Sequence, residues 1–381
     1  MASTPSFRHA LTSLIGASSV SSTSARHDQG NMEVIHLLAN WLNELGFECE
    51  ILPLDGQSHK ANLIATLGQG SGGLVLSGHT DTVPYDDKGW QSDPLILTER
   101  DQRLYGLGSC DMKGFFAVVL EAIQGYKASD LKQPLIILAT ADEESSMAGA
   151  QALLASGRQL GRYALIGEPT GLVPVYKHKS IMMQSIQVRG QAGHSSNPLL
   201  GNSALEIMHD VIGELLNYRQ QLQLSHQDTD FAVAYPTLNL GCIHGGDNPN
   251  RICSHCELHF DARLLPSMDN STVTAEIEQL LGPIAQRHGA IIELSPLIDG
   301  VAPFAQDGGE LITACERLTG NQAQAVNFAT EAPFLQAMGM ETLVLGPGSI
   351  DQAHQPDEFL PMDNIQPMVK IIRQLIAQFC Q

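Results

Sequence analysis

Residues 72–90, GGLVLSGHTDTVPYDDKGW, join a short apolar run to a polar end, and this stretch decides the fold class. Residues 74–76 follow two glycines and are typical of a strand that is buried on both faces of a parallel sheet. His79 and Asp81 come at its carboxyl end, the edge where open α/β sheets bind ligands. Because residues two apart on a strand share a face, we expect the Asp81 carboxylate to hold the ring of a metal-ligating His79. The alternative is a pair of side chains that satisfy each other at a turn.

The composition indicates a globular protein with more than one domain and argues against two kinds of partner. The 381 residues exceed what one hydrophobic core usually supports. With 21 Lys and Arg against 41 Asp and Glu, the net charge of -20 repels nucleic acid and anionic membrane surfaces. The seven cysteines are odd in number and scattered, which favours a reducing, cytoplasmic environment over a disulfide framework. No run reaches the roughly 18 apolar residues that a membrane span needs.

The order of the predicted elements indicates an α/β domain that is interrupted by an α+β domain. Strands alternate with helices in the first 178 residues and again after about residue 320, which is typical of a mostly parallel sheet covered on both faces. From about residue 180 the order becomes βαββαβ, the ferredoxin-like split βαβ sandwich. We therefore predict a catalytic α/β domain formed by residues 1–178 and 290–381, with an inserted domain at residues 179–289.

Further metal-competent side chains follow the other predicted strands and one glycine-rich turn. They are Asp111 in LYGLGSCDMKGFF, Glu143 and Glu144 in LIILATADEE, Glu168 after YALIG, and His354 in TLVLGPGSIDQAHQPDE. Two imidazoles and several carboxylates without cysteine suit a hydrolytic zinc or cobalt centre. With His79 added and Glu143 set aside as the general base, five candidate ligands remain. Five ligands exceed what one catalytic ion takes, so two divalent metal ions sharing a carboxylate are implied. Each acid taken alone is also typical of a turn or a helix cap.

Three other features of the sequence have competing interpretations. Cys253 and Cys256 form a single C-x-x-C, which is weak evidence for a metal or redox site because it lies inside a predicted strand. Cys110 is interpreted as a small packed residue rather than a ligand. His194, in QAGHSSNP, lies in a predicted turn marked by Gly193 and Asn197-Pro198, and it is either an exposed loop residue or a catalytic one.

Together these motifs resemble a known family. The resemblance to the dinuclear zinc deacylases and peptidases of the M20 type covers nearly the whole chain and rests on SGHTDTVP, YGLGSCDMKGFFA, ATADEESSMAGA, IGEPT, GHSSNP and GPGSIDQAHQPDE. The further presence of GGDNPNRIC and NFATEAPF resembles the bacterial members that deacetylate N2-acetyl-L-ornithine. The resemblance implies a cytoplasmic amidohydrolase of arginine biosynthesis that acts on a small N-acetylated amino acid.

The resemblance also implies roles for residues of the proposed metal site. It assigns the metal ligands as Asp111 for the bridge, His79 and Glu168 for one ion, and Glu144 and His354 for the other. Glu143 matches the general base, and Asp81 matches the partner that orients the histidine. Cys110 departs from the family pattern, in which a small non-thiol residue is expected before the bridging aspartate.

The inserted domain resembles the lid and dimerisation domain of the family. The resemblance implies a homodimer in which His194 reaches the substrate of the partner subunit, and it implies substrate contacts from Asn250 and Arg263. We add the hypothesis that Glu331, in the turn TEAPF, binds the terminal ammonium of the substrate; a glutamate favoured by a helix N-terminus is the alternative. The alternative functions are a sister deacylase, such as a succinyl-diaminopimelate desuccinylase or a broad aminoacylase, and a non-catalytic metal-binding protein.

Overall fold

The structure, a computed structural model, describes residues 5–381 and divides the chain into two compact units. Unit 1 contains the chain up to Tyr176 together with Gln306–Gln324 and Thr330–Gln381, and unit 2 contains Lys177–Ala305 and Ala325–Ala329. The chain enters unit 2 within two residues of the predicted boundary at residue 179. It leaves unit 2 well after the predicted boundary at residue 289, because the strand that follows residue 289 still pairs within the sheet of unit 2.

Unit 1 is built on most of a nine-stranded sheet whose centre is parallel; the edge strand Phe304–Ala305 of this sheet belongs to unit 2. In order across the sheet, the strands are β1 (Glu48–Leu54), β2 (Gln57–Leu67), β6 (Leu135–Thr140), β3 (Leu74–His79), β7 (Tyr163–Ile166), β15 (Glu341–Val344), β8 (Val175–His178) and β13 (Phe304–Ala305), with β14 (Gln324–Val326) paired to β8. β6, β3, β7 and β15 run parallel to one another, and the strands on either side of them are antiparallel. The prediction of an α/β domain with a mostly parallel sheet is confirmed.

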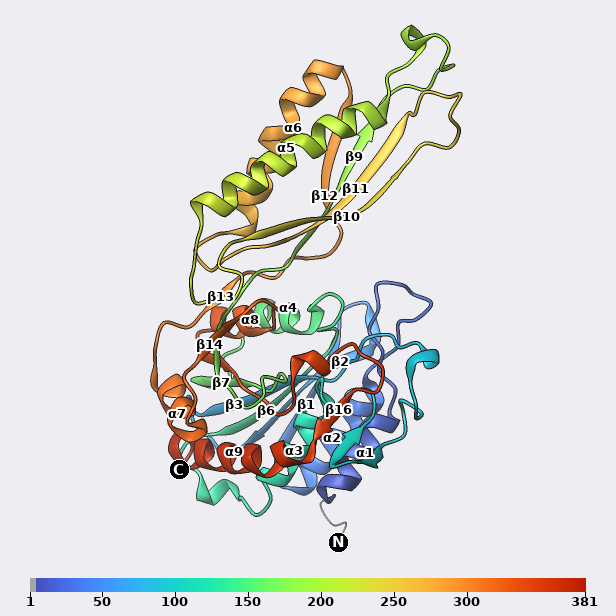
Figure 1. The fold of residues 1–381 in the computed structure, drawn as a ribbon. Coiled ribbons are helices and arrows are strands. Elements are labelled where there is room, and N and C mark those ends of the chain that lie inside the picture. Colours follow the sequence, from blue (N-terminus) through green and yellow to red (C-terminus); the bar gives the residue numbers. More distant parts are fainter. Residues whose placement is uncertain (1–4) are drawn as a thin grey trace. The chain divides into compact units, whose positions relative to one another are not determined.

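Helices cover both faces of this sheet (Figure 1). One face carries α1 (Phe7–Gly16), α2 (Met32–Glu44), α3 (Lys113–Ala122) and α9 (Ile365–Phe379), and the other carries α4 (Ala148–Ala155) and α8 (Ala332–Ala337). α7 (Glu310–Thr319) packs against α9 and β15. Because both faces are covered, β3 and β6 are buried along their whole length, which explains the apolar runs seen in the sequence.

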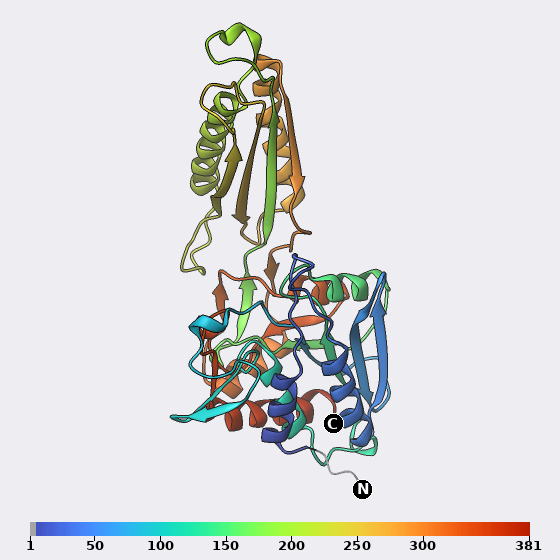
Figure 2. The same ribbon diagram turned by 90° about the vertical axis from the view of Figure 1, so that its right-hand side faces the viewer.

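Unit 2 is an α+β sandwich with a core of its own. Its elements are β9 (Met182–Arg189), α5 (Ala204–Ser225), β10 (Thr237–Gly245), β11 (His255–Arg263), α6 (Asn270–His288) and β12 (Ile291–Pro296). The strands pair antiparallel in the order β10-β11-β9-β12, so the predicted ferredoxin-like βαββαβ fold is confirmed. Ile186, Leu258, Ile207 and Ile277 belong to one buried apolar cluster between the sheet and the two helices, which run beside the long strands in Figure 2.

A small third sheet and several short helices were not expected from the sequence. The sheet consists of β16 (Phe359–Pro361), β5 (Arg103–Tyr105) and β4 (Thr98–Arg100), and it lays the segment before β16 against the loop after β5. The 3-10 helices are Asp87–Gly89, Ala128–Asp130, Pro198–Leu200, Ile350–Gln352 and Met362–Asn364. Of the helices in residues 5–381, none combines the length and the hydropathy required to cross a membrane.

Candidate metal centre

The predicted ligands come together because parallel strands end at the same edge of the central sheet. β3 ends at His79, β6 ends three residues before Glu143, and β7 ends two residues before Glu168. The loop after β15 supplies His354, and the loop that leads into α3 supplies Asp111. The structure therefore gathers at one edge the residues that the sequence analysis placed after separate strands.

Asp111 lies between the two histidines of this cluster. Its Oδ1 is 3.1 Å from His79 Nε2, and its Oδ2 is 3.7 Å from His354 Nε2. His79 Nε2 is also 3.8 Å from Glu168 Oε1, and His354 Nε2 is 2.9 Å from Glu144 Oε2. One carboxylate thus faces two imidazoles, and each imidazole has a glutamate of its own.

Two sets of side chains in the cluster place their ligand atoms close enough to share a cation. The sets, in each of which the atoms lie within 4.8 Å of one another, are His79 with Glu143 and Glu168, and His79 with Asp111 and Glu144. No other set of three meets this distance within residues 5–381. The cluster is buried except at His354, whose side chain is 55% exposed, compared with 7% for Asp111 and Glu144.

Burial and mutual repulsion raise the pKa values of the glutamates in the cluster. The pKa of Glu143 and the pKa of Glu168 lie well above the usual carboxyl value, first because of burial and then because of neighbouring carboxylates. Burial and the nearby Asp111 also raise the pKa of Glu144. A set of crowded carboxylate oxygens and imidazoles fits divalent cations, since their charge would relieve this repulsion.

Asp81 holds the main chain of the glutamate pair rather than the ring of His79. Its carboxylate accepts hydrogen bonds from the main-chain N–H of Glu143, at 3.2 Å, and of Glu144, at 3.0 Å. His79 Nδ1 lies 3.0 Å from the main-chain oxygen of Asp81, whereas the nearest carboxylate oxygen is 3.8 Å away. The expected contact between carboxylate and ring is not formed, because β3 ends at His79, so the alternation of a strand no longer applies to Asp81.

A buried ion pair anchors the segment that carries the two glutamates, and no sequence motif signalled it. Lys60 Nζ lies 2.8 Å from an oxygen of Asp28 and 2.8 Å from an oxygen of Asp142, the residue before Glu143. Asp142 has a left-handed backbone conformation, with φ of 59°. Side-chain contacts therefore hold the turn into Glu143 in a conformation that a non-glycine residue seldom adopts.

Glu358 is a second residue of the site that sequence reasoning missed. It lies directly before β16 and is 2% exposed. Its carboxylate accepts hydrogen bonds from the main-chain N–H of Gly108, Cys110 and Asp111. These partners are 247 to 250 residues away in the chain, so no local pattern could reveal the contact.

Comparison with known proteins agrees with this arrangement. Residues 75–378 match the sequence profile of Peptidase family M20/M25/M40. The chain belongs to this family. Within the M20/M25/M40 family, the acetylornithine deacetylase of Photorhabdus laumondii subsp. laumondii is 47% identical over 377 residues, which cover 99% of this chain and 98% of the relative. The protein of the same name from Klebsiella pneumoniae is 47% identical over 379 residues, with the same coverage of both chains.

Solved structures of family members share the fold across both units. The aminopeptidase PepT from Bacillus cereus superposes with a TM-score of 0.73 at 21% identity and covers 98% of this chain and 97% of its own. The metallo-carboxypeptidase Sso-CP2 from Sulfolobus solfataricus gives a TM-score of 0.75 at 17% identity, with 98% of both chains covered. The YXEP protein from Bacillus subtilis, described as a dinuclear metal-binding peptidase, gives 0.69 at 15% identity, with 98% and 97% covered. At these identities the likeness concerns the fold alone.

In this M20/M25/M40 member, the three other residues implied by the resemblance lie in unit 2. His194 and Asn250 are exposed and occupy neighbouring loops, since Ser195 N–H donates to the main-chain oxygen of Asn250. Arg263 ends β11, at the opposite end of that strand from these loops, and its Nε donates to Asp261 at 2.8 Å. Within unit 2, the structure therefore brings His194 and Asn250 together but not Arg263.

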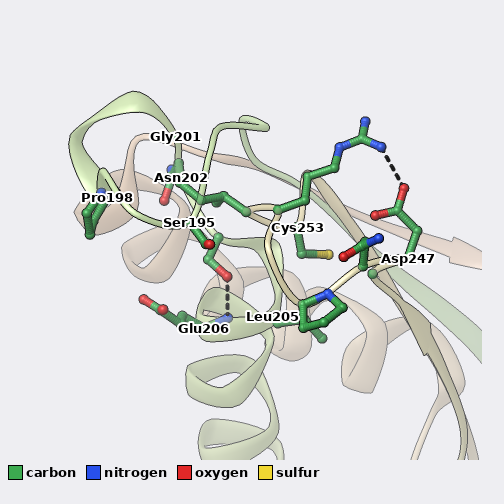
Figure 3. Close-up of a pocket in the computed structure, with 14 residues that line it drawn as sticks. Ser195, Pro198, Gly201, Asn202, Leu205, Glu206, Asp247 and Cys253 are labelled. Carbon is green, nitrogen blue, oxygen red and sulfur yellow. Dashed lines mark hydrogen bonds and ion pairs between the residues drawn. The ribbon is translucent and has the colours of Figure 1, made fainter.

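A surface pocket of about 490 Å³ lies beside the same loops (Figure 3). Ser195 and Asn202 line it from one loop, and Asp247 and Cys253 line it from the other. Arg251 also lines the pocket, and its guanidinium pairs with Asp247 at 2.7 Å. None of the clustered acids and histidines of unit 1 is among the residues that line this pocket.

Glu331 and Cys110, two further residues that the sequence analysis singled out, are buried. Glu331 is 1% exposed; its Oε2 accepts from Thr140 Oγ1 at 2.9 Å, and its Oε1 has no hydrogen-bond partner in residues 5–381. Burial raises the pKa of Glu331 to about 7. Cys110 is a packed residue whose Sγ contacts the main-chain oxygen of Ser349, and all seven cysteines are free.

Proposed function

We propose that the chain hydrolyses N2-acetyl-L-ornithine to L-ornithine and acetate, a step of arginine synthesis, in the cytoplasm. The observation that carries the reaction class is the buried cluster in which Asp111 faces both His79 and His354. The substrate rests on full-length similarity to four curated proteins named acetylornithine deacetylase. A cluster of ligands with an additional carboxylate is expected of a hydrolase, since a protein that only binds metal needs no general base.

Two divalent metal ions, zinc or cobalt, fit the donors of the cluster. Asp111 would be shared, with His79 and Glu168 at one ion and Glu144 and His354 at the other. When bound, such ions polarise a carbonyl oxygen and lower the pKa of water towards neutrality. The Bacillus subtilis protein of the same fold is described as dinuclear, which supports the number of ions.

Glu143 is the proposed proton carrier of the reaction. It lies in the same set of close donors as His79 and Glu168, and burial raises its pKa above the usual carboxyl value, which favours uptake of a proton. Glu143 would accept a proton from the attacking water and pass it to the amide nitrogen, which leaves poorly unless it is protonated. Asp81 would keep this carboxylate in place by holding the main-chain N–H of Glu143.

Substrate recognition would involve both units and a second copy of the chain. We propose a homodimer in which His194 donates a hydrogen bond to the oxyanion formed in the partner subunit, while Asn250 and Arg263 contact the substrate. The exposure of His194 and its position beside Asn250 support a contact of this kind. Glu331 would bind the terminal ammonium, and its unpartnered Oε1 beside the end of β6 supports this role.

The test is the release of acetate from N2-acetyl-L-ornithine, measured together with the metal content of the purified protein. A panel containing N-succinyl-diaminopimelate and a neutral N-acetyl-amino acid separates the proposed activity from that of sister deacylases. Hydrolysis that continues unchanged after the ions are removed by a chelator, or that is absent with every substrate of the panel, would contradict the proposal. A Glu143→Gln variant with intact metal content is the matched control for contaminating hydrolases.

A further inference from the structure

Glu358 accepts several hydrogen bonds from the loop that carries Asp111. Oε1 accepts from the main-chain N–H of Cys110 at 2.8 Å and of Asp111 at 2.9 Å, and Oε2 accepts from Gly108 at 3.1 Å. The main-chain oxygen of Glu358 also accepts from Gly106 N–H at 3.1 Å. The same oxygen accepts from Ser109 Oγ at 3.4 Å, so residue 358 binds five positions of one loop.

This loop has little regular structure to support it. Residues 106–112 lie between β5 and α3, and Gly108 has a left-handed backbone with φ of 78°. Buried main-chain N–H groups need an acceptor, and here one carboxylate supplies it for three of them. Because three hydrogen bonds end on one side chain, the contact restrains several main-chain positions of the loop at once.

A second buried carboxylate binds main-chain N–H groups of the cluster in the same way. Asp81, itself buried, binds the main-chain N–H of Glu143 and of Glu144. In both cases a buried carboxylate that is not a proposed ligand holds the backbone of residues that are. Asp81 holds the base and one terminal ligand, whereas Glu358 holds the ligand that lies between the two histidines.

We propose that Glu358 is a positioning residue that sets the place of Asp111 relative to His354. Glu358 and His354 belong to one segment, four residues apart, so a single side chain ties the loop of the shared ligand to the loop of a ligand of one ion. This role rests on the proposed function of Asp111 as a metal ligand. Without the contact, Asp111 would keep its chemistry but lose its fixed distance to His354.

The variants that test the proposal change the hydrogen-bonding group or the reach of the side chain at residue 358. Glu358→Gln keeps the size, and its amide oxygen can still accept from Cys110 and Asp111, but its NH2 group would oppose the N–H of Gly108. Glu358→Asp keeps the charge and shortens the side chain by one methylene, so it cannot reach all three donors. Asp357→Asn is the matched control, because it makes the same chemical change at the next residue, where the side chain accepts from Gln91 N–H at 2.9 Å.

The measurement is the affinity of the metal-free protein for Co²⁺ and Zn²⁺, with the melting temperature of the metal-free protein recorded alongside. We expect Glu358→Gln to bind at least one ion roughly 10- to 100-fold more weakly and to lower kcat more than it changes KM, as losses of residues that orient ligands do. Glu358→Asp should fall between Gln and wild type, and Asp357→Asn should match wild type. If Glu358→Gln does not fold, the weaker ion binding of Glu358→Asp decides the question.

Two outcomes would overturn the proposal. One is unchanged ion affinity in Glu358→Gln with a lower melting temperature of the metal-free protein, which would show a purely structural role. The other is an equal loss of affinity in Asp357→Asn. A wild-type protein that binds no ions would instead disprove the proposed function, so the two failures are distinguishable.

Discussion

Lys60 and Asp142 form a buried ion pair, with 2.8 Å between Nζ and a carboxylate oxygen. Asp142 is the residue directly before Glu143 in the chain. The Lys60 side chain is 4% exposed and also binds Asp28, so two carboxylates depend on one cation. The pair holds Asp142 in its left-handed conformation and thereby places the proposed base. Structural stability and catalysis are therefore coupled at this point.

Lys60→Met should destabilise the protein by roughly 3–5 kcal/mol, because it leaves the buried carboxylate of Asp142 and the partly exposed carboxylate of Asp28 without their cation. Denaturant unfolding measures the change, and kcat should also fall in the fraction that remains folded. Arg158→Met is the control: it removes the exposed pair with Glu50 and should leave stability close to that of wild type. Equal losses in the two variants would contradict a special role for Lys60.

Glu143→Gln should lower kcat by about 10²- to 10⁴-fold, because it removes the group that carries the proton. KM and metal content should change little, since the amide keeps the size of the side chain and Asp81 still binds the main-chain N–H. Steady-state kinetics with acetylornithine and metal analysis check this expectation. A loss of bound metal equal to the loss of rate would indicate that Glu143 is mainly a ligand.

Removal of the ions should abolish activity and lower the melting temperature, because ligands that bind only the folded state stabilise it. The crowded carboxylates of the cluster would then repel one another without compensation. Scanning calorimetry with and without a chelator, followed by addition of Zn²⁺ or Co²⁺, measures both effects. Asp111→Asn should bind the ions more weakly, so the chelator should change its melting temperature much less.

His178 should make the protein lose stability as the pH falls from 6.5 towards 4. Burial lowers the pKa of His178 from 6.5 to about 4, and Nδ1 lies 2.8 Å from the main-chain oxygen of Lys179, to which it donates. Between these pH values the unfolded chain binds a proton at this residue and the folded chain does not, so acid favours unfolding by up to about 3 kcal/mol.

Comparison of wild type with His178→Phe isolates this effect from the titration of other groups. The ring of His178 packs on Phe304, and phenylalanine can keep that contact. The variant should be less stable at pH 7, because the oxygen of Lys179 loses its donor, and the difference from wild type should shrink as the pH falls. A constant difference between pH 7 and pH 4 would show that His178 titrates normally.

Glu331→Gln should reduce the preference for acetylornithine over a neutral N-acetyl-amino acid, because it removes the negative charge proposed to bind the ammonium. The ratio of kcat/KM for the two substrates measures this preference. Unchanged selectivity would dispose of the hypothesis and leave Glu331 as an acid at the N-terminus of α8 that accepts a hydrogen bond from Thr140.

The fold and the gathering of the ligands were predictable because local patterns encode them. The apolar runs of β3 and β6 reveal buried parallel strands, and such strands end at one edge, which brings His79 near Glu143. The prediction for Asp81 identified a supporting residue but not its contact, since it extended strand geometry beyond His79, where the strand ends.

The residues that support the cluster could not be predicted from local patterns. Lys60 binds Asp142 across 82 residues, and Glu358 binds Asp111 across 247 residues. Neither contact has a characteristic spacing, and each depends on how distant loops pack once the sheet has formed. The boundary at residue 289 failed for a similar reason, because the membership of β12 is decided by its pairing with β9.

The ends of unit 2 have a simple geometric relation. Lys177 and Ala305 stand opposite each other where β8 and β13 pair antiparallel, so the chain departs and returns through two adjacent strands. Topologically, the segment Lys177–Ala305, which forms nearly all of unit 2, occupies the place of a hairpin turn. A chain built this way can gain, lose or exchange such a module during evolution while the order of strands in the host sheet stays the same.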